Sequence, residues 1–143
     1  MLASHFSGMA LANARLGVVH GFAAPLGGQY GASHGALCAA LLPSVVAMNL
    51  EALGKRVPSS PVLRRYQEAA RILTGNAQAG ADDLVAFTER LRKEMGIPRL
   101  KELGARKEDF TALVAKAAQA SSTKGNPIEL TAEEMQVILE NAY

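Results

Sequence analysis

The chain has 143 residues, of which 49% are hydrophobic, as expected for a single globular domain with a buried core. Its net charge of +2, without a dense run of Lys and Arg, argues against a nucleic-acid partner. Cys38 is the only cysteine, so the chain can form no internal disulfide.

The first third of the chain predicts two buried helices separated by a loop. Ser4 to Leu16 carries small or apolar residues on nearly every side, which predicts a buried helix. Gly21 to Ser33 contains Pro25 and four glycines, which predicts a loop or a short turn of helix. A second buried helix is expected from His34 to Leu53, with a kink at Pro43.

The longest apolar stretch, Ala36 to Leu50, lies within this second helix. A proline and two polar residues interrupt it, so we expect it to be too short and too polar to span a membrane. The N-terminus also lacks the basic and apolar regions of a signal peptide. The sequence therefore predicts a cytoplasmic protein without a membrane partner.

The remainder of the chain predicts amphipathic helices with charged outer faces. No segment alternates polar and apolar residues as a half-buried strand does. Four helices are expected, with N-terminal signals at Ser60, Asp82 and Thr131: Ser60 to Thr74, Asp82 to Met95, Glu108 to Gln119, and a last helix that begins after Thr131. The predicted fold is an all-α orthogonal bundle of about six helices in one domain, residues 1–143.

His20 and His34 are the residues most indicative of chemistry. They stand fourteen positions apart among small residues and glycines. A neutral imidazole is a good ligand for a divalent metal ion, and the segment from Pro25 to Gly31 could reverse the chain and bring the two rings together. The pair therefore predicts two ligands of a metal site.

Each histidine also has a simpler explanation. His20 follows a predicted helix, and the helix dipole favours a histidine at a helix C-terminus. His34 begins the next helix, where the dipole disfavours the charged imidazolium and leaves a neutral ring that suits a metal ligand. Other candidate donors have their own explanations, since Cys38 is expected in the core and Asp82 as a helix cap. The residues alone therefore indicate half of a metal site.

The segment from Gly17 to Pro43, followed by Asn49, resembles the second signature of the iron-containing alcohol dehydrogenases. Weaker similarity continues through Met95-Gly96-Ile97-Pro98 and Asn126-Pro127, so the resemblance covers essentially the whole chain. It implies a dehydroquinate synthase-like helical domain, the C-terminal part of this architecture. The maleylacetate reductases are similar close relatives.

This resemblance implies a metal centre and a nicotinamide cofactor. In that family an N-terminal α/β domain binds NAD or NADP, and a helical domain holds iron (Fe²⁺) or sometimes zinc (Zn²⁺) with one aspartate and three histidines. His20 and His34 match the last two of these histidines. The substrates are small alcohols or aldehydes. Ala24 stands where many members have a further histidine, which puts a proton route through that position in doubt.

The chain contains no glycine-rich nucleotide-binding loop. The resemblance therefore implies the metal-binding portion of an oxidoreductase, inactive as an isolated chain. The alternative is a stand-alone helical module that binds a protein partner without catalysis. In either case, the face left by the absent nucleotide-binding domain is expected to be apolar and could form a homo-oligomer.

Overall fold

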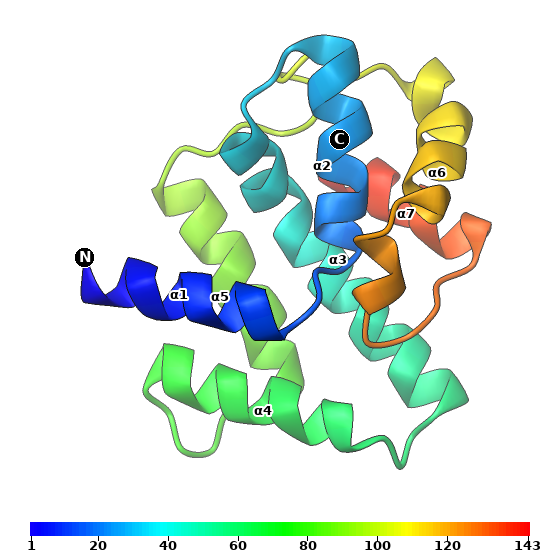
Figure 1. Ribbon diagram of the computed structural model, residues 1–143. Helices are drawn as coiled ribbons and strands as arrows, with labels where there is room; N and C mark the ends of the chain where they lie inside the picture. The colour runs from blue at the N-terminus through cyan, green and yellow to red at the C-terminus, as the bar shows by residue number, and fades with distance from the viewer.

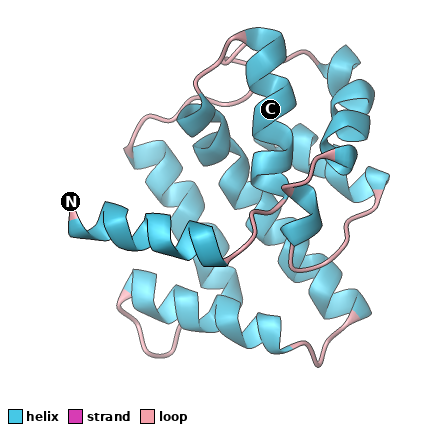
Figure 2. Ribbon diagram, viewed as in Figure 1, coloured by secondary structure: helices cyan, strands magenta, loops and turns pink.

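The computed structural model describes residues 1–143 as an all-helical domain without strands (Figures 1 and 2). The predicted fold class is confirmed, with seven α-helices in place of about six. Two short 3₁₀ turns, η1 and η2, precede and follow α6. The elements are α1 Leu2–Asn13, α2 Val18–Tyr30, α3 His34–Arg56, α4 Pro61–Thr74, α5 Ala81–Glu94, η1 Lys107–Asp109, α6 Phe110–Gln119, η2 Thr123–Gly125 and α7 Ala132–Ala142.

Helix α3 is shared by the two hydrophobic clusters of the domain. The main cluster lies between α2, α3, α6 and α7, and includes Leu41 and Val45 of α3. A smaller cluster lies between α3, α4 and α5, and includes Val46 and Leu50. Successive residues of a helix point about 100° apart, so Val45 and Val46 can belong to different clusters. Burial on two sides holds α3 in place and, with it, the residues at its start.

The predicted loop from Gly21 to Ser33 is wrong, because most of it forms α2. Val18, Phe22 and Leu26 recur at helical spacing and are fully buried. Pro25 and the glycines lower helix propensity, but propensity is a weak preference that the burial of an apolar face can override. Pro25 costs one backbone hydrogen bond, to the carbonyl of Gly21, without ending the helix.

The prediction that the first helix is buried is also wrong. Helix α1 extends to one side of the domain, with the N-terminus at its tip (Figure 1), and none of its residues is buried. Its apolar side chains, such as Phe6, are largely exposed. A helix that is apolar on every side is normally covered by other parts of a protein. No other part of these 143 residues covers α1.

Helix α3 is longer than the sequence predicted, since it continues through Gly54 to Arg56. Its 23 residues are long and apolar enough to cross a membrane by length and composition. However, 61% of its most apolar stretch is buried within the domain. This burial is that of a core helix, and Pro43 lies on its buried side.

Two of the three helix-start signals in the second half of the chain are confirmed, at Ser60 and Thr131. Asp82 is not the cap of α5, because that helix begins after Gly80 and Asp83 makes the capping contact. Ser60 Oγ accepts a hydrogen bond from the Val62 amide, and Pro61 occupies the first turn of α4. Thr131 and Glu134 form the capping box that begins α7. These signals are local, so they hold whatever the tertiary packing is.

Candidate metal centre

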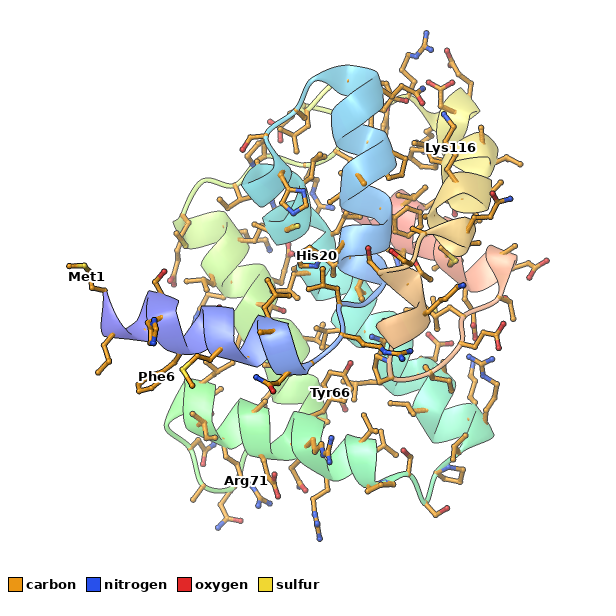
Figure 3. The ribbon with its side chains drawn as sticks, viewed as in Figure 1. Met1, Phe6, His20, Tyr66, Arg71 and Lys116 are labelled. Carbon is orange, nitrogen blue, oxygen red and sulfur yellow. The ribbon has the colours of Figure 1, made fainter.

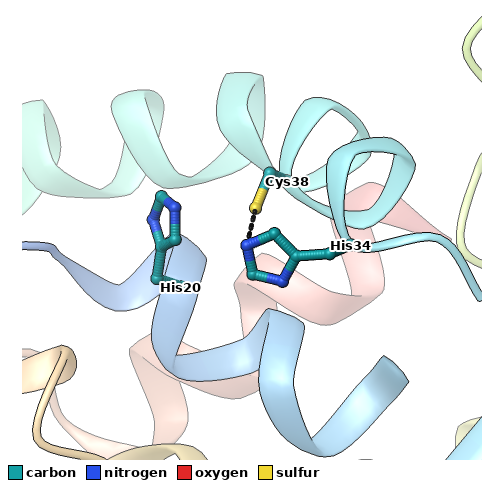
Figure 4. A group of neighbouring side chains, drawn as sticks. All are labelled: His20, His34 and Cys38. Carbon is teal, nitrogen blue, oxygen red and sulfur yellow. Dashed lines mark hydrogen bonds between the residues drawn. The ribbon is translucent and has the colours of Figure 1, made fainter. Parts of the chain in front are cut away.

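The connection between α2 and α3 brings His20 and His34 together. Gly31 ends α2 in a left-handed conformation, with φ of 67°. It is the first of the three residues, 31–33, that connect α2 to the start of α3. The two imidazole centroids lie 5.4 Å apart, with the ring planes inclined by 51° (Figure 4). The predicted proximity of the two rings is thus present, although the reversal lies at residues 31–33, at the very end of the segment expected to supply it.

His20 lies in the first turn of α2 and not at the end of a helix. Residues 14–17, which precede α2, belong to no helix. The explanation of His20 as a helix C-terminal histidine is therefore wrong. His34 is the first residue of α3, as predicted.

Cys38 supplies a third donor beside the two histidines. It lies one turn after His34 on α3, and its Sγ is 3.5 Å from His34 Nε2 (Figure 4). Ligand atoms of His20, His34 and Cys38 all lie within 4.8 Å of one another. Cys38 is partly buried and contacts the main cluster, so the predicted core position describes only one side of it. The signal that could have found this donor is its spacing of four residues from His34.

The surroundings favour the neutral forms of His20 and Cys38 in the absence of an ion. Burial lowers the pKa of His20, and the positive charge of a protonated His34 lowers it further. Burial raises the pKa of the Cys38 thiol. A neutral imidazole carries the free lone pair that a metal ion requires, so the electrostatics suit coordination.

A groove of about 600 Å³ adjoins the cluster. His20 and Tyr66 line it (Figure 3), together with Cys38, Asn49 and apolar side chains such as Leu42. Mostly apolar walls with a few polar groups are typical of sites that bind small molecules. The donors are therefore next to a space that a small substrate can enter.

A partly buried hydrogen-bond network fixes one wall of this groove. Asn126 Nδ2 donates to Asn49 Oδ1 at 2.7 Å, and Asn49 Nδ2 donates to the Tyr66 hydroxyl at 3.1 Å. Asn126 Oδ1 accepts from the Val18 amide at 3.2 Å, two residues before His20. In the sequence, Asn126 is notable only as part of the Asn126-Pro127 pair, and no local pattern indicates its role across the domain. The network positions the start of α2, which carries His20.

The remaining histidine, His5, and the aspartates Asp82 and Asp109 lie outside the cluster. His5 is exposed on α1, and Asp82 is exposed in the first turn of α5. Asp109 accepts hydrogen bonds from the Tyr30 hydroxyl at 2.7 Å and from Arg106. Ala24 is exposed one turn after His20 on α2 and offers no side-chain donor.

Comparison with known proteins gives consistent matches along the whole chain. The family model described as the Fe-containing alcohol dehydrogenase family, C-terminal, matches residues 1–143. Alcohol dehydrogenase 4 of Saccharomyces cerevisiae (strain YJM789) is 34% identical over 142 residues, covering 99% of this chain and 35% of the yeast protein. Lactaldehyde reductase of Escherichia coli (strain K12) is 32% identical over 148 residues, covering 99% of this chain and 36% of that protein.

A solved structure shows the same arrangement of helices. Alcohol dehydrogenase from Oenococcus oeni superposes with a TM-score of 0.79 at 35% identity, over 95% of this chain and 35% of that chain. The chain thus spans about a third of the length of the relatives that it matches. From the match over its full length, the chain belongs to the iron-containing alcohol dehydrogenase family, whose C-terminal part it represents.

Proposed function

We propose that this chain is the metal-binding helical portion of an oxidoreductase that interconverts small alcohols and aldehydes, with His20 and His34 as metal ligands. The observation that carries the proposal is the 5.4 Å separation of the two imidazole rings, which residues fourteen positions apart reach only through the turn between α2 and α3. Membership of a family described as iron-containing supports it.

The residues fit a divalent ion and a small substrate. His20 and His34 present imidazole nitrogens from two different helices, and the adjoining groove is large enough for a short-chain alcohol. Its apolar walls would exclude water from the carbon chain, and His20 lies on the same groove. An ion bound here would supply Lewis-acid polarisation of the substrate oxygen.

The nicotinamide cofactor, NAD or NADP, belongs to the same proposal. No strand and no glycine-rich phosphate loop occur in these 143 residues, and the relatives are about three times as long. We therefore propose that NAD(P) is bound by residues outside this stretch. On this account the isolated chain binds metal but does not oxidise alcohol.

Metal binding tests the ligand assignment. The chain is dialysed against Zn²⁺ and, without oxygen, against Fe²⁺, and compared with its His20→Ala, His34→Ala and His5→Ala variants. We expect about one ion per chain, with at least about a tenfold loss of affinity in the first two variants. His5 is the matched control because it is the remaining histidine and is exposed on α1. Equal affinities in all four proteins would refute the assignment.

An activity assay tests whether this chain needs residues outside it to bind NAD(P). The isolated chain, loaded with Fe²⁺ or Zn²⁺, is incubated with ethanol or a longer alcohol and NAD, and the formation of NADH is followed. We expect none. Clear metal-dependent turnover would show that these residues suffice for cofactor binding and would contradict this part of the proposal.

Helix α1 favours a second candidate, a helical module that binds another polypeptide or a second copy of this chain. It buries none of its residues within the domain and exposes a set of large apolar side chains, Leu2, Phe6, Met9 and Leu11. Light scattering after size exclusion measures self-association. Association that Phe6→Ser abolishes, in a chain that binds no metal, would favour this candidate over the first.

A further inference from the structure

The thiol of Cys38 lies beside the imidazole rings of His20 and His34 (Figure 4). Cys38 follows His34 by four residues on α3, and its Sγ lies 3.5 Å from His34 Nε2. Side chains four residues apart share one face of a helix, and a helix can thereby present two ligands to the same ion. His20 approaches from α2, and the donors of all three residues lie within 4.8 Å of one another.

The distance between Sγ and Nε2 matches that of two ligands on one ion. Zinc binds sulfur at about 2.3 Å and imidazole nitrogen at about 2.0–2.1 Å in a tetrahedral arrangement, which separates the two donors by roughly 3.5 Å. The observed separation is 3.5 Å. A hydrogen bond between thiol and imidazole gives a similar distance for that pair, but it does not account for the third donor on the facing helix.

From these contacts we propose that Cys38 is a third ligand of the ion held by His20 and His34, and that two imidazoles with one thiolate favour zinc over iron. The inference rests on the proposed function, because it adds a donor to the same site. Thiolate is a soft ligand, and soft ligands select zinc more strongly than carboxylate does.

Coordination requires the thiol to lose its proton. Burial raises the pKa of Cys38, so the side chain is a neutral thiol before an ion binds. On binding, the S–H bond breaks, Sγ bonds to the cation, and the proton passes to solvent. No electron is transferred, so the step needs neither an oxidant nor a reductant. Cys38 lines the open groove, which gives water and the ion access to Sγ.

Cobalt(II) distinguishes the ligands spectroscopically. The chain and its Cys38→Ser and Cys38→Ala variants are titrated with Co²⁺ without oxygen. Because Cys38 is the only cysteine, a thiolate-to-cobalt charge-transfer band in the near ultraviolet has a single source. The visible d–d bands report bound cobalt whichever residues hold it. Far-ultraviolet circular dichroism confirms that each variant keeps its helices.

We expect the charge-transfer band in the unmodified chain and its loss in both Cys38 variants. The Zn²⁺ affinity of these variants should fall by at least about tenfold, and their preference for Zn²⁺ over Fe²⁺ should fall with it. His20→Ala and His34→Ala should weaken both sets of bands, whereas His5→Ala should leave both unchanged.

Two contrary results are distinguishable. Visible bands without a charge-transfer band, together with unchanged Zn²⁺ affinity in the Cys38 variants, would overturn the thiolate ligand and leave the histidine site in place. Cobalt binding that survives both His20→Ala and His34→Ala would overturn the proposed function itself.

Discussion

Asn126 uses both ends of its side-chain amide to join segments that are distant in the sequence. Its Nδ2 donates to Asn49 Oδ1 at 2.7 Å and to the Ile128 carbonyl at 2.8 Å, and its Oδ1 accepts from the Val18 amide at 3.2 Å. A β-carbon on Gly17 would lie 2.9 Å from that oxygen, so only glycine permits the approach. The first turn of α2, with His20, is therefore anchored by one side chain.

Removing this amide should destabilise the domain. Asn126→Ala leaves the buried Asn49 side chain without its main partner and should lower the free energy of unfolding by about 1–3 kcal/mol. Urea denaturation followed by circular dichroism measures the loss. Asn141→Ala, at an exposed position of α7, is the control and should change little. Equal losses in the two variants would show that the network adds no stability.

At the scale of elements, the close approach of α2 to η2 depends on Gly21, which has no side chain. A β-carbon on Gly21 would overlap Thr123 Oγ1, which donates to the Ala117 carbonyl at 2.6 Å. Helix α2 can therefore pack tightly on the end of α6 only with glycine here. Gly28, on the same helix, has open space around it and tests the opposite case.

Gly21→Ala and Gly28→Ala should act in opposite directions. The first should destabilise the domain by about 1–3 kcal/mol, because the new methyl group forces α2 and η2 apart. The second should stabilise it by up to about 1 kcal/mol, since alanine favours the helical backbone. Melting temperatures of the two variants and the unmodified chain provide the test. Stabilisation by both changes would show that the contact with Thr123 yields easily.

Helices α4 and α7 were predictable because each has local signals at its start. Ser60, Thr131 and Glu134 act within a few residues of the helix starts that they fix. Helix α2 was missed for the same reason, since the local signals of Pro25 and its glycines oppose the helix, and only burial in the main cluster stabilises it. The exposure of α1 depends on which segments reach it, and no local pattern encodes that.

The metal site, too, was predictable from the sequence only in part. His20 and His34 could be identified from their residue type and setting, while their proximity required the turn after α2. The sequence alone predicts Cys38 as a core residue, and only the structure shows that its Sγ lies beside His34. The bond between Asn126 and Val18 joins residues 108 positions apart, so sequence spacing gives no indication of it.

Across the whole molecule, a charged cluster on α5 connects the two halves of the domain. Glu89 pairs with Arg92 at 2.9 Å, Arg99 at 3.5 Å and Lys93 at 3.6 Å. Arg92 also donates to the Ile97 carbonyl, and Arg99 to the Asn141 carbonyl at the end of α7. The hydrogen bond from Arg92, then the charges of Arg92, Arg99 and Lys93, lower the pKa of Glu89 although burial opposes them.

This cluster predicts a pH-dependent contribution to stability. Because the folded state lowers the pKa of Glu89, its contribution is complete above the unfolded value of about 4.3 and is lost as the pH falls through the lower folded value. Glu89→Gln should lower stability by about 0.5–1 kcal/mol near neutral pH, allowing for partial solvent exposure of the carboxylate. Melting curves at several pH values should show this difference shrinking below about pH 4.

Glu68→Gln is the matched control, since Glu68 pairs with Arg64 at 3.7 Å on the exposed face of α4. Its effect should be small at every pH, as for most exposed ion pairs. A Glu89→Gln difference that persists unchanged in acid would mean that the side chain contributes by packing and not by charge.

The central claim is that His20 and His34 hold one metal ion between α2 and α3. Anomalous diffraction at the zinc edge, from crystals of this chain grown with Zn²⁺, tests it most directly. The account predicts a single strong peak within about 2.0–2.1 Å of a nitrogen on each ring. A zinc peak elsewhere on the protein, with none between these two rings, would contradict it.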